Sequence, residues 1–479
     1  MQRILSNEQM RIADKFTIEN LGISSDELIE RAGRAVAQVI KKRLLGGRVL
    51  VCMGKGNNGK DGKVIADNLS KMHGFTVNTL NVYNGIFKVF DNKFDVIVDC
   101  IFGTGLNRDV EGNYKKAIEK INQSGAYVVS CDIASGLNGD NGKVMGCAVK
   151  ANLTVAIQEL KLGHFLNDGP DYSGEVTSVD IGISIWGDDF VKKISPNSAI
   201  KLFPERNRNV NKGHFGKTCI IGGSLCYPGS ILLSANAVSA LKMGVGYCNL
   251  AVPGSLVQNY VCKTPECTFT PIKDENGFLC YDQDALGRLL KYNSIAIGMG
   301  LGTSEYVYKT ICYLLSNYCG VLIIDADGLN SLAKFGVEVL KNAKCRVILT
   351  PHVGEFARLG GYNKEEIVSD GINLAKQFAH TYGVILVLKS ATSIITDGEE
   401  MYLNTSGCSG MAKGGSGDVL SGFIAGVTAR YNDPLFDAVV CAHLFGLAGE
   451  IAQKEHGSYC MLASDIINAL PKAIKSLSN

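Results

Sequence analysis

A glycine-rich turn ahead of an apolar helix is the segment of this sequence best suited to chemistry. Residues 414–417 are Gly-Gly-Ser-Gly, and the small and apolar residues after them predict a helix beginning near Val419. In such a turn free backbone N–H groups lie at the positive end of the helix, where they can bind an anion or stabilise developing negative charge. Asp418 stands in the first helical turn, where its carboxylate either takes part in chemistry or is simply stabilised by the helix dipole.

A second set of polar residues follows three predicted strands in the first half of the chain. Asn58 lies in the glycine-rich loop 54–62, Asp99 ends the next strand, and Asp132 ends the third, with Ser135 close behind. Because ligands of an open parallel sheet bind at the carboxyl ends of its strands, we expect these residues at one edge. Each aspartate alone would equally well cap a helix, and the glycines of the loop alone could also form a tight turn without a ligand.

Two phosphate-binding motifs occur only in part. Residues 54–59 match the spacing G-x-G-x-x-G, but the next predicted strand lacks the acidic residue that would bind a ribose. Residues 214–224 contain Gly-Lys-Thr, yet Asn211 stands where a P-loop needs a glycine, and the motif precedes its strand. Neither motif by itself predicts a nucleotide site, and Lys217 is expected on the surface.

Two series of alternating strands and helices are predicted to position these residues. In the first half, helical segments alternate with short apolar runs that predict buried strands at 48–54, 94–105, 126–136 and 153–158. In the second half, similar runs predict strands at 217–223, 247–253, 294–300, 321–328, 346–351 and 384–390. The pattern breaks down from about 181 to 210. We therefore expect two α/β domains, 1–205 and 206–479, of which the first is a Rossmann-like three-layer α/β/α domain.

Composition excludes several classes of protein. The 48 Lys and Arg nearly balance the 46 Asp and Glu without forming a long charged block, so no nucleic-acid partner is expected. The 16 Cys are scattered, with no C-x-x-C and no zinc-ligand spacing, which favours reduced thiols. The N-terminus lacks the apolar core of a signal peptide, and no apolar run approaches the length of a membrane span. These features predict a cytoplasmic protein that has no membrane partner.

The first 200 residues resemble NAD(P)H-hydrate epimerases, in the segments NNGKD (57–61), GTGLNRDV (103–110) and DIASGLNGDNG (132–142). The resemblance implies K⁺ at Asn58, Asp99 and Ser135, and Asp132 as catalytic acid/base. Lys60 replaces the usual glycine and Ala134 the usual proline. The implied hydrate contacts are Asn57, Asn58, Gly59, Lys60, Asp61, Gly103, Thr104, Gly105, Leu106, Asn107, Arg108, Asp109 and Asp132.

The remaining chain, from about 205, resembles ADP-dependent NAD(P)H-hydrate dehydratases of the ribokinase-like superfamily. The segments GGSGDVL (414–420), DADGLN (325–330), TPHVGEFARL (350–359) and VLKSATSII (387–395) carry this resemblance. It implies a ribokinase-like α/β/α sandwich with Asp418 as the base. It also implies hydrate contacts at Ser230, Gly302, His352 and Asp418, and nucleotide contacts at Lys389, Ser390, Ala391, Thr392, Ser393, Gly414, Gly415, Ser416 and Gly417. His352 alone would more simply cap a turn.

Together the two resemblances imply one repair pathway for hydrated nicotinamide cofactors. The second domain phosphorylates the ring hydroxyl from ADP, phosphate leaves, and the double bond returns, yielding AMP and NADH or NADPH. This step uses only the S epimer, so the first domain supplies that epimer from the R form. The implied cofactors are K⁺ for the epimerase domain and Mg²⁺ for the dehydratase domain, and the chain is expected to form a homo-oligomer.

Two other functions stay open from the motifs alone. A ribokinase-like kinase acting on another small molecule with ATP would also contain Gly-Gly-Ser-Gly-Asp. A dinucleotide-binding protein without turnover would keep the same loops, and Lys60 makes this alternative fit the first domain better than the second. Recovery of reduced nicotinamide from its hydrate would favour repair over both alternatives.

Overall fold

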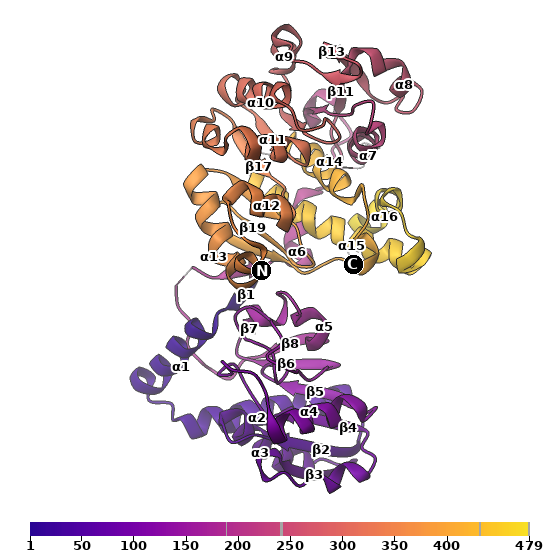
Figure 1. Cartoon of the computed structure of the whole chain (residues 1–479). Coiled ribbons are helices and arrows are strands. Elements are labelled where there is room, and N and C mark those ends of the chain that lie inside the picture. Colours follow the sequence, from indigo (N-terminus) through magenta and orange to yellow (C-terminus); the bar gives the residue numbers. More distant parts are fainter. Residues whose placement is uncertain (188, 240–242, 431–432, 478–479) are drawn as a thin grey trace. The chain divides into compact units, whose positions relative to one another are not determined.

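The computed structural model describes residues 1–187, 189–239, 243–430 and 433–477 (Figure 1). The chain divides into two compact units between Val191 and Lys192, with Met1 grouped with the second. Residues 192–205, which we expected to close the first domain, therefore belong to the second unit. The reason is packing, because Ile194, Ala199 and Leu202 are buried in the apolar core of that unit.

The first unit contains a parallel sheet in the order β3-β2-β4-β5-β6-β8. Its strands are β2 (Gly47–Met53), β3 (Phe75–Asn81), β4 (Val96–Cys100), β5 (Tyr127–Cys131), β6 (Leu153–Ile157) and β8 (Glu175–Val179). Two short strands, β1 (Gln2–Leu5) and β7 (Leu160–Lys161), pair with each other in parallel. The helices are α1 (Asn7–Leu21), α2 (Ser25–Arg43), α3 (Asn57–Ser70), α4 (Gly112–Gln123) and α5 (Gly169–Ser173).

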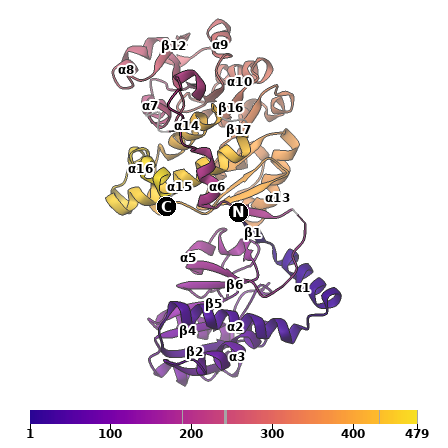
Figure 2. The ribbon, with the colours of Figure 1, turned by 180° about the vertical axis from the view of Figure 1, so that it is seen from behind.

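Helices cover both faces of this sheet (Figures 1 and 2). Helix α2 buries Val36, Ala37 and Ile40 at helical spacing, and with α3 it forms one core against alternate residues of β2 and β4. Helix α4 forms a second core against the residues of the opposite face, including Leu50 and Ile97. The three-layer α/β/α arrangement predicted for this unit is confirmed.

The second unit contains a mixed sheet in the order β12-β11-β10-β15-β16-β17-β18-β19-β20, antiparallel only where β19 meets β18 and β20. Its strands are β10 (Lys217–Ile221), β11 (Tyr247–Pro253), β12 (Thr268–Ile272), β15 (Ser294–Ile297), β16 (Val321–Ile324), β17 (Arg346–Leu349), β18 (Ile385–Leu388), β19 (Ser393–Thr396) and β20 (Met401–Asn404). A separate hairpin joins β13 (Asp274–Glu275) to β14 (Phe278–Leu279), and β9 (Val191–Lys193) begins at the division between the units.

Two helical layers enclose this sheet (Figures 1 and 2). One layer consists of α7 (Pro228–Ser239), α14 (Ser416–Thr428), α15 (Pro434–Cys460) and α16 (Ala463–Ser476). The other consists of α10 (Glu305–Asn317), α11 (Asp327–Phe335), α12 (Val353–Gly360) and α13 (Lys364–Tyr382). Shorter helices are α6 (Pro196–Ala199), α8 (Val257–Val261) and α9 (Gln283–Leu289). The predicted α/β/α sandwich is confirmed.

Helix α15 differs from the sequence expectation that no segment could span a membrane. By length and composition alone it is long and apolar enough to do so, but 67% of its most apolar window is buried inside the structure. It packs against α14 and α16. A helix that is apolar on most sides is equally typical of a buried core helix, which is its place here.

Candidate active sites

The first candidate site lies at the carboxyl ends of β2, β4 and β5 in the first unit. Asp99, the fourth residue of β4, is fully buried. Its carboxylate accepts hydrogen bonds from the Ser135 hydroxyl (2.6 Å), the Ser135 backbone N–H (2.9 Å) and the Ser130 hydroxyl (2.9 Å). Burial raises the pKa of Asp99, and these donors oppose that rise by stabilising the carboxylate.

Asn58, in the first turn of α3, reaches the same place. Its amide Nδ2 donates to the carbonyl of Phe102 at 2.7 Å and to that of Cys131 at 3.2 Å. The Phe102 N–H in turn donates to the Ser135 hydroxyl at 2.8 Å, so that Asn58, Asp99 and Ser135 form one connected group. Among the described residues, the buried Oδ1 of Asn58 has no hydrogen-bond partner.

An unpartnered amide oxygen beside a buried carboxylate and a hydroxyl is a donor set that fits a hard cation of low charge. Within the described ranges, no three or more His, Cys, Asp or Glu side chains gather as a metal cluster. The donors at this site are neutral oxygens with one carboxylate, which suit a monovalent ion better than a divalent one.

Asp132 follows β5 with φ of 69°, a left-handed conformation that is uncommon for a residue other than glycine. Its carboxylate Oδ1 accepts from the backbone N–H of Ile157 at 3.1 Å and from the ammonium of Lys161. Lys161 is only 2% exposed, and it also donates to the Ile157 carbonyl at 2.6 Å. A buried ammonium thus fixes the position of the Asp132 carboxylate.

His164 holds the backbone of the same residue. Burial, followed by the nearby Lys161 charge, lowers the pKa of His164 to about 4, so the imidazole is neutral near pH 7. Its Nδ1 accepts from the Lys161 N–H at 3.1 Å, which leaves Nε2–H to donate to the Asp132 carbonyl at 2.9 Å. Lys161 and His164 were not identified from the sequence, because no motif joins this loop to Asp132.

Asp61, in α3, is the third carboxyl group of this site. Burial, together with the charges of Asp132 and Asp14, raises the pKa of Asp61 to about 8. Asp61 therefore carries a proton at neutral pH. The site thus holds a protonated carboxylic acid near a carboxylate paired with lysine, an arrangement that separates a proton donor from a proton acceptor.

The other residues predicted for this site lie around it. A side chain added at Gly103 would place its Cβ 3.6 Å from Asn58 Cβ and 3.7 Å from Asp132 Oδ2, so this glycine borders both residues. Leu106 points into the core formed with α4 instead of toward the site. Gly59 is buried and Thr104 half-buried, whereas the exposed residues are Asn57, Lys60, Gly105, Asn107, Arg108 and Asp109.

The second candidate site is built on the first turn of α14. Gly415 caps this helix with φ of 90° and is followed by Ser416, Gly417 and Asp418. Burial and the charge of Asp325 raise the pKa of Asp418 to about 7. The hydroxyl of Ser230, in the first turn of α7, hydrogen-bonds to the Asp418 carboxylate. The predicted base and a predicted substrate residue are therefore adjacent, although 188 positions (418 − 230) separate them in sequence.

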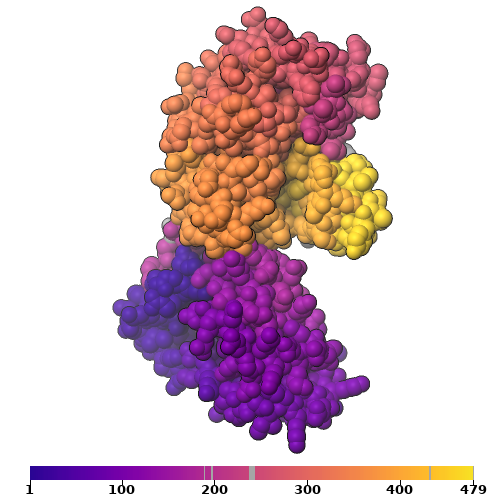
Figure 3. Space-filling view, in the orientation of Figure 1, coloured from indigo at the N-terminus to yellow at the C-terminus, as the bar shows by residue number. Residues whose placement is uncertain are grey.

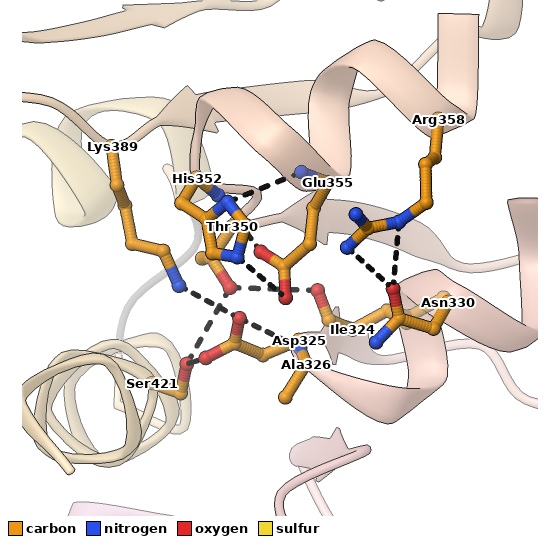
Figure 4. Close-up of polar contacts among 10 residues, drawn as sticks. All are labelled: Ile324, Asp325, Ala326, Asn330, Thr350, His352, Glu355, Arg358, Lys389 and Ser421. Carbon is orange, nitrogen blue, oxygen red and sulfur yellow. Dashed lines mark hydrogen bonds and ion pairs between the residues drawn. The ribbon is translucent and has the colours of Figure 1, made fainter. Parts of the chain in front are cut away.

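Asp325, directly after β16, organises the other side of this turn. Its carboxylate accepts from the ammonium of Lys389 at 2.8 Å and from the hydroxyl of Ser421 in α14 at 2.6 Å, as Figure 4 shows. A Cβ added at Gly417 would lie 3.1 Å from Lys389 Nζ. The lysine charge and the helix N-terminus thus meet at one point, where both favour an anion.

His352 caps α12 and also lies partly open to solvent. Its Nδ1 accepts from the Glu355 N–H at 3.1 Å, and Glu355 Oε2 accepts from the His352 N–H at 2.8 Å (Figure 4). Burial lowers the pKa of His352, although 56% of its side chain remains exposed. The simple capping role considered from the sequence is present, and Nε2 lies 3.6 Å from Glu355 Oε1.

The remaining predicted residues extend the site along the sheet edge. Gly302, after β15, donates its N–H to Asp327 at 2.8 Å, and Asp327 in turn raises the pKa of Asp418 as one of the weaker causes. Ser390 and Ala391 are exposed in the turn between β18 and β19, with Thr392 buried and Ser393 half-buried.

In Figure 3 the second unit is hollowed between the orange part of the chain and the yellow C-terminal helices.

Asp325, Asp327, Glu355 and Ser421 belong to this site but were not among the residues predicted for it. Asp325 could have been found by the argument applied to Asp99 and Asp132, because it too ends a buried strand of a parallel sheet. Ser421 gives no such signal, since a serine inside an apolar helix has no recognisable partner in the sequence.

Comparison with known proteins finds relatives for both units. The family model described as "NAD(P)H-hydrate dehydratase" matches residues 218–472, and the model described as "YjeF-related protein N-terminus" matches residues 25–88 and 81–163. The bifunctional NAD(P)H-hydrate repair enzyme Nnr of Thermofilum pendens is 35% identical, over 98% of this chain and 95% of its own. That of Moorella thermoacetica is 31% identical, over 99% and 97%.

Among solved structures, the ADP/ATP-dependent NAD(P)H-hydrate dehydratase of Bacillus subtilis, co-crystallised with ATP and Mg²⁺, aligns with a TM-score of 0.52 and 27% identity. The alignment covers 60% of this chain and 99% of that one. A ribokinase-like superfamily protein of Enterococcus faecalis aligns with a TM-score of 0.51 and 25% identity. The relation thus covers both units in sequence and the second unit in structure.

Proposed function

This chain belongs to the bifunctional NAD(P)H-hydrate repair enzymes, and we propose how its two sites divide that activity. The first unit is the epimerase and the second the nucleotide-dependent dehydratase. In our proposal the epimerase interconverts the R and S hydrates of NADH and NADPH, and the dehydratase converts the S form back at the expense of ADP, releasing AMP and phosphate.

Asp418 is the base of the dehydratase in this proposal. It accepts the proton of the ring hydroxyl as that oxygen attacks the terminal phosphorus of ADP, and the bond to the leaving AMP oxygen breaks. Phosphate then leaves the ring carbon while the neighbouring carbon loses a proton, which restores the double bond. A pKa near 7 suits this role, because the carboxylate is ionised near neutral pH and still basic enough to accept the proton.

The nucleotide would lie between Lys389 and the N-terminus of α14. The Lys389 ammonium and the N–H groups of the turn 414–417 offer positive charge to the transferring phosphoryl group. Residues 390–393 follow Lys389 in the same turn and would contact the rest of the nucleotide. Asp325 accepts a hydrogen bond from the Lys389 ammonium at 2.8 Å and so positions the lysine beside the turn.

Mg²⁺ would enter the dehydratase with the nucleotide. This ion usually keeps several waters and binds one or two carboxylates together with phosphate oxygens. Asp325 and Asp327 are carboxylates close enough to Asp418 to raise its pKa, so they are the candidates to meet a phosphate-bound cation. Its contribution would be to neutralise phosphate charge during transfer.

Asp132 and Asp61 carry the epimerase chemistry in this proposal. Inverting the carbon requires that its hydroxyl leave and return, or that the ring open and close, and each route needs a proton donor and a proton acceptor. Asp61 holds a proton at neutral pH, whereas Asp132 is held by Lys161 in the position of an acceptor. Asn57–Asp61 and Gly103–Asp109, apart from the buried side chain of Leu106, would surround the hydrate.

K⁺ would be held at Asn58, Asp99 and Ser135. The observation that supports this is the unpartnered Oδ1 of Asn58, which a cation would satisfy. Bound there, the ion would supply positive charge beneath the loop that begins at Gly103. We also propose that the protein acts in the cytoplasm as a homo-oligomer, as the sequence resemblance implies.

The observation that carries the dehydratase proposal is Asp418 beside a glycine-built helix N-terminus and the Lys389 ammonium. The test is to supply the full-length protein with NADH hydrate, ADP and Mg²⁺. We expect absorbance of the reduced nicotinamide to return, with one AMP and one phosphate for each NADH. A stable phosphorylated product, formed without return of absorbance, would instead identify a small-molecule kinase.

A further inference from the structure

Several large apolar side chains of the second unit are exposed around one end of the dehydratase site. Tyr227 is 57% exposed, Leu225 60% and Phe278 38%. They belong to two segments, the loop between β10 and α7 and the hairpin β13–β14. Clustered apolar exposure on a protein surface is a recognised mark of a binding site, whereas single exposed residues are not.

Contacts between loops bring these side chains together. The N–H of Leu225 donates to the carbonyl of Gly277 at 3.0 Å, which fastens the hairpin to the loop after β10. A Cβ added at Gly277 would lie 2.9 Å from Leu225 Cβ. One at Gly302 would lie 3.9 Å from the Phe278 ring, so this ring stands over a residue predicted to contact the hydrate.

Tyr227 lies next to the group that contacts the base. A Cβ added at Gly300 would lie 2.9 Å from Tyr227 Cβ and 3.0 Å from Ser230 Cβ. The hydroxyl of Ser230 bonds to the Asp418 carboxylate. Tyr227 and Ser230 thus both border Gly300, at the edge formed by the loops after β10 and β15.

The sheet order separates this aromatic edge from the phosphate-binding positions. Strands β10 and β15 are neighbours, β16 and β17 follow, and Lys389 comes after β18. Anion-binding groups lie at the β18 end, and apolar rings at the β10 end, with Asp418 between them. A phosphate donor belongs at the charged end, which leaves the aromatic end for the molecule that carries the hydroxyl.

We propose that Tyr227 and Phe278 hold the hydrated nicotinamide ring against the loops after β10 and β15, and that they set how tightly the second unit binds this substrate. The inference rests on the proposed function, since it assigns the substrate of the same site. The flat apolar faces of the two rings suit a six-membered ring better than they suit phosphate. These residues bind and orient the substrate and transfer no proton.

The test compares Tyr227→Ala and Phe278→Ala with Tyr459→Ala, a control in which the aromatic side chain is 95% exposed on α15. With NADH hydrate, we expect each of the first two to raise KM for the hydrate about tenfold, with kcat and the KM for ADP within about twofold of wild type. Phe278→Tyr should restore the KM, because it keeps the ring face. An unchanged KM in an active Phe278→Ala protein would overturn the inference.

A shorter substrate identifies the ring. The hydrate of reduced nicotinamide mononucleotide lacks the adenylate half, and we expect the same increase in KM with it. Loss of the effect with this substrate would mean that the rings contact adenine, which would overturn our assignment. If wild-type protein shows no ADP-dependent turnover, the proposed function fails, and calorimetric titration with the hydrate then decides whether Phe278→Ala weakens binding.

Discussion

Each of the two sites contains a carboxylate that is proposed to exchange a proton with the substrate. The charged groups beside these two carboxylates differ. In the first unit Asp132 is paired directly with the buried ammonium of Lys161. In the second, Asp418 has Asp325 close by, and the lysine of that site is paired with Asp325 instead. A directly bonded ammonium fixes the position of the Asp132 carboxylate, whereas burial and the charge of Asp325 raise the pKa of Asp418. The position of the lysine thus separates an oriented acceptor from a base that functions near neutral pH.

The largest expected effect comes from removing the base of the second unit. Asp418→Asn keeps the shape of the side chain but cannot accept a proton, so we expect dehydratase kcat to fall about 10³-fold. The measurement is ADP-dependent return of absorbance from the S hydrate, and epimerisation by the same variant is the control. Retention of a tenth of the wild-type rate would show that another group is the base.

Removing the buried ammonium of the first unit should lower the stability of the protein. Lys161→Met leaves the Asp132 carboxylate half-buried without its partner, and we expect a loss of about 3–5 kcal/mol in the free energy of unfolding. Denaturant unfolding measures this loss. The double variant Lys161→Met, Asp132→Asn removes both charges and should recover most of it. If the double variant is as unstable as Lys161→Met alone, the ion pair between Lys161 and Asp132 does not stabilise this loop.

The pH dependence of the two activities should differ in sign. Asp418 acts as an ionised base with a pKa of about 7, so dehydratase kcat/KM should fall about tenfold for each pH unit below that value. Asp61 acts as a protonated acid with a pKa of about 8, so epimerase kcat/KM should fall above it. Rate profiles of one protein preparation from pH 5 to 10 test both limbs, and two profiles of the same shape would contradict the comparison.

A neighbouring charge should shift the dehydratase profile. Asp325 raises the pKa of Asp418, so Asp325→Asn should move the acid limb to lower pH. Because Lys389 also loses its ion pair, the KM for ADP should change in the same variant. Asp327→Asn is the matched control, since it removes a carboxylate that is a weaker cause of the shift. An unmoved limb in both variants would show that burial alone sets the basicity of Asp418.

The smallest expected effect comes from the hydroxyl that joins Asp325 to α14. Ser421→Ala removes a 2.6 Å hydrogen bond to a buried carboxylate, and we expect a loss of about 1.5–3 kcal/mol in stability. Lys389 would be held less firmly, which should raise the KM for ADP a few-fold without changing the KM for the hydrate. Thr428→Val in the same helix removes only an intrahelical bond and serves as control. A change confined to the hydrate KM would contradict this assignment.

The sequence predicted most strands and the residues at their ends because local signals determine both. Buried parallel strands are continuous apolar runs, and β2, β10 and β16 all show that pattern. The hairpin of β19 and β20 was missed, since each strand has four residues and neither alternates clearly. The boundary at 205 differed from the division at Val191 because the intervening residues look polar but contribute apolar anchors to the second core.

The ion pairs between residues of distant loops could not be predicted from the sequence. Lys161 meets Asp132 across 29 residues, and Lys389 meets Asp325 across 64, with no periodic pattern linking either pair. The sequence could indicate the carboxylates, because they end predicted strands, but not the ammonium groups that distinguish their roles. That distinction comes from the tertiary fold.

The central claim is that separate carboxylates perform the two steps, and a mixture of R and S NADH hydrate tests it most directly. With excess ADP and Mg²⁺, wild-type protein should return all of the absorbance, Asp132→Asn should stop once the S form is consumed, and Asp418→Asn should return none. Consumption of the R form by Asp132→Asn at the wild-type rate would contradict the account, as would recovery of NADH by Asp418→Asn.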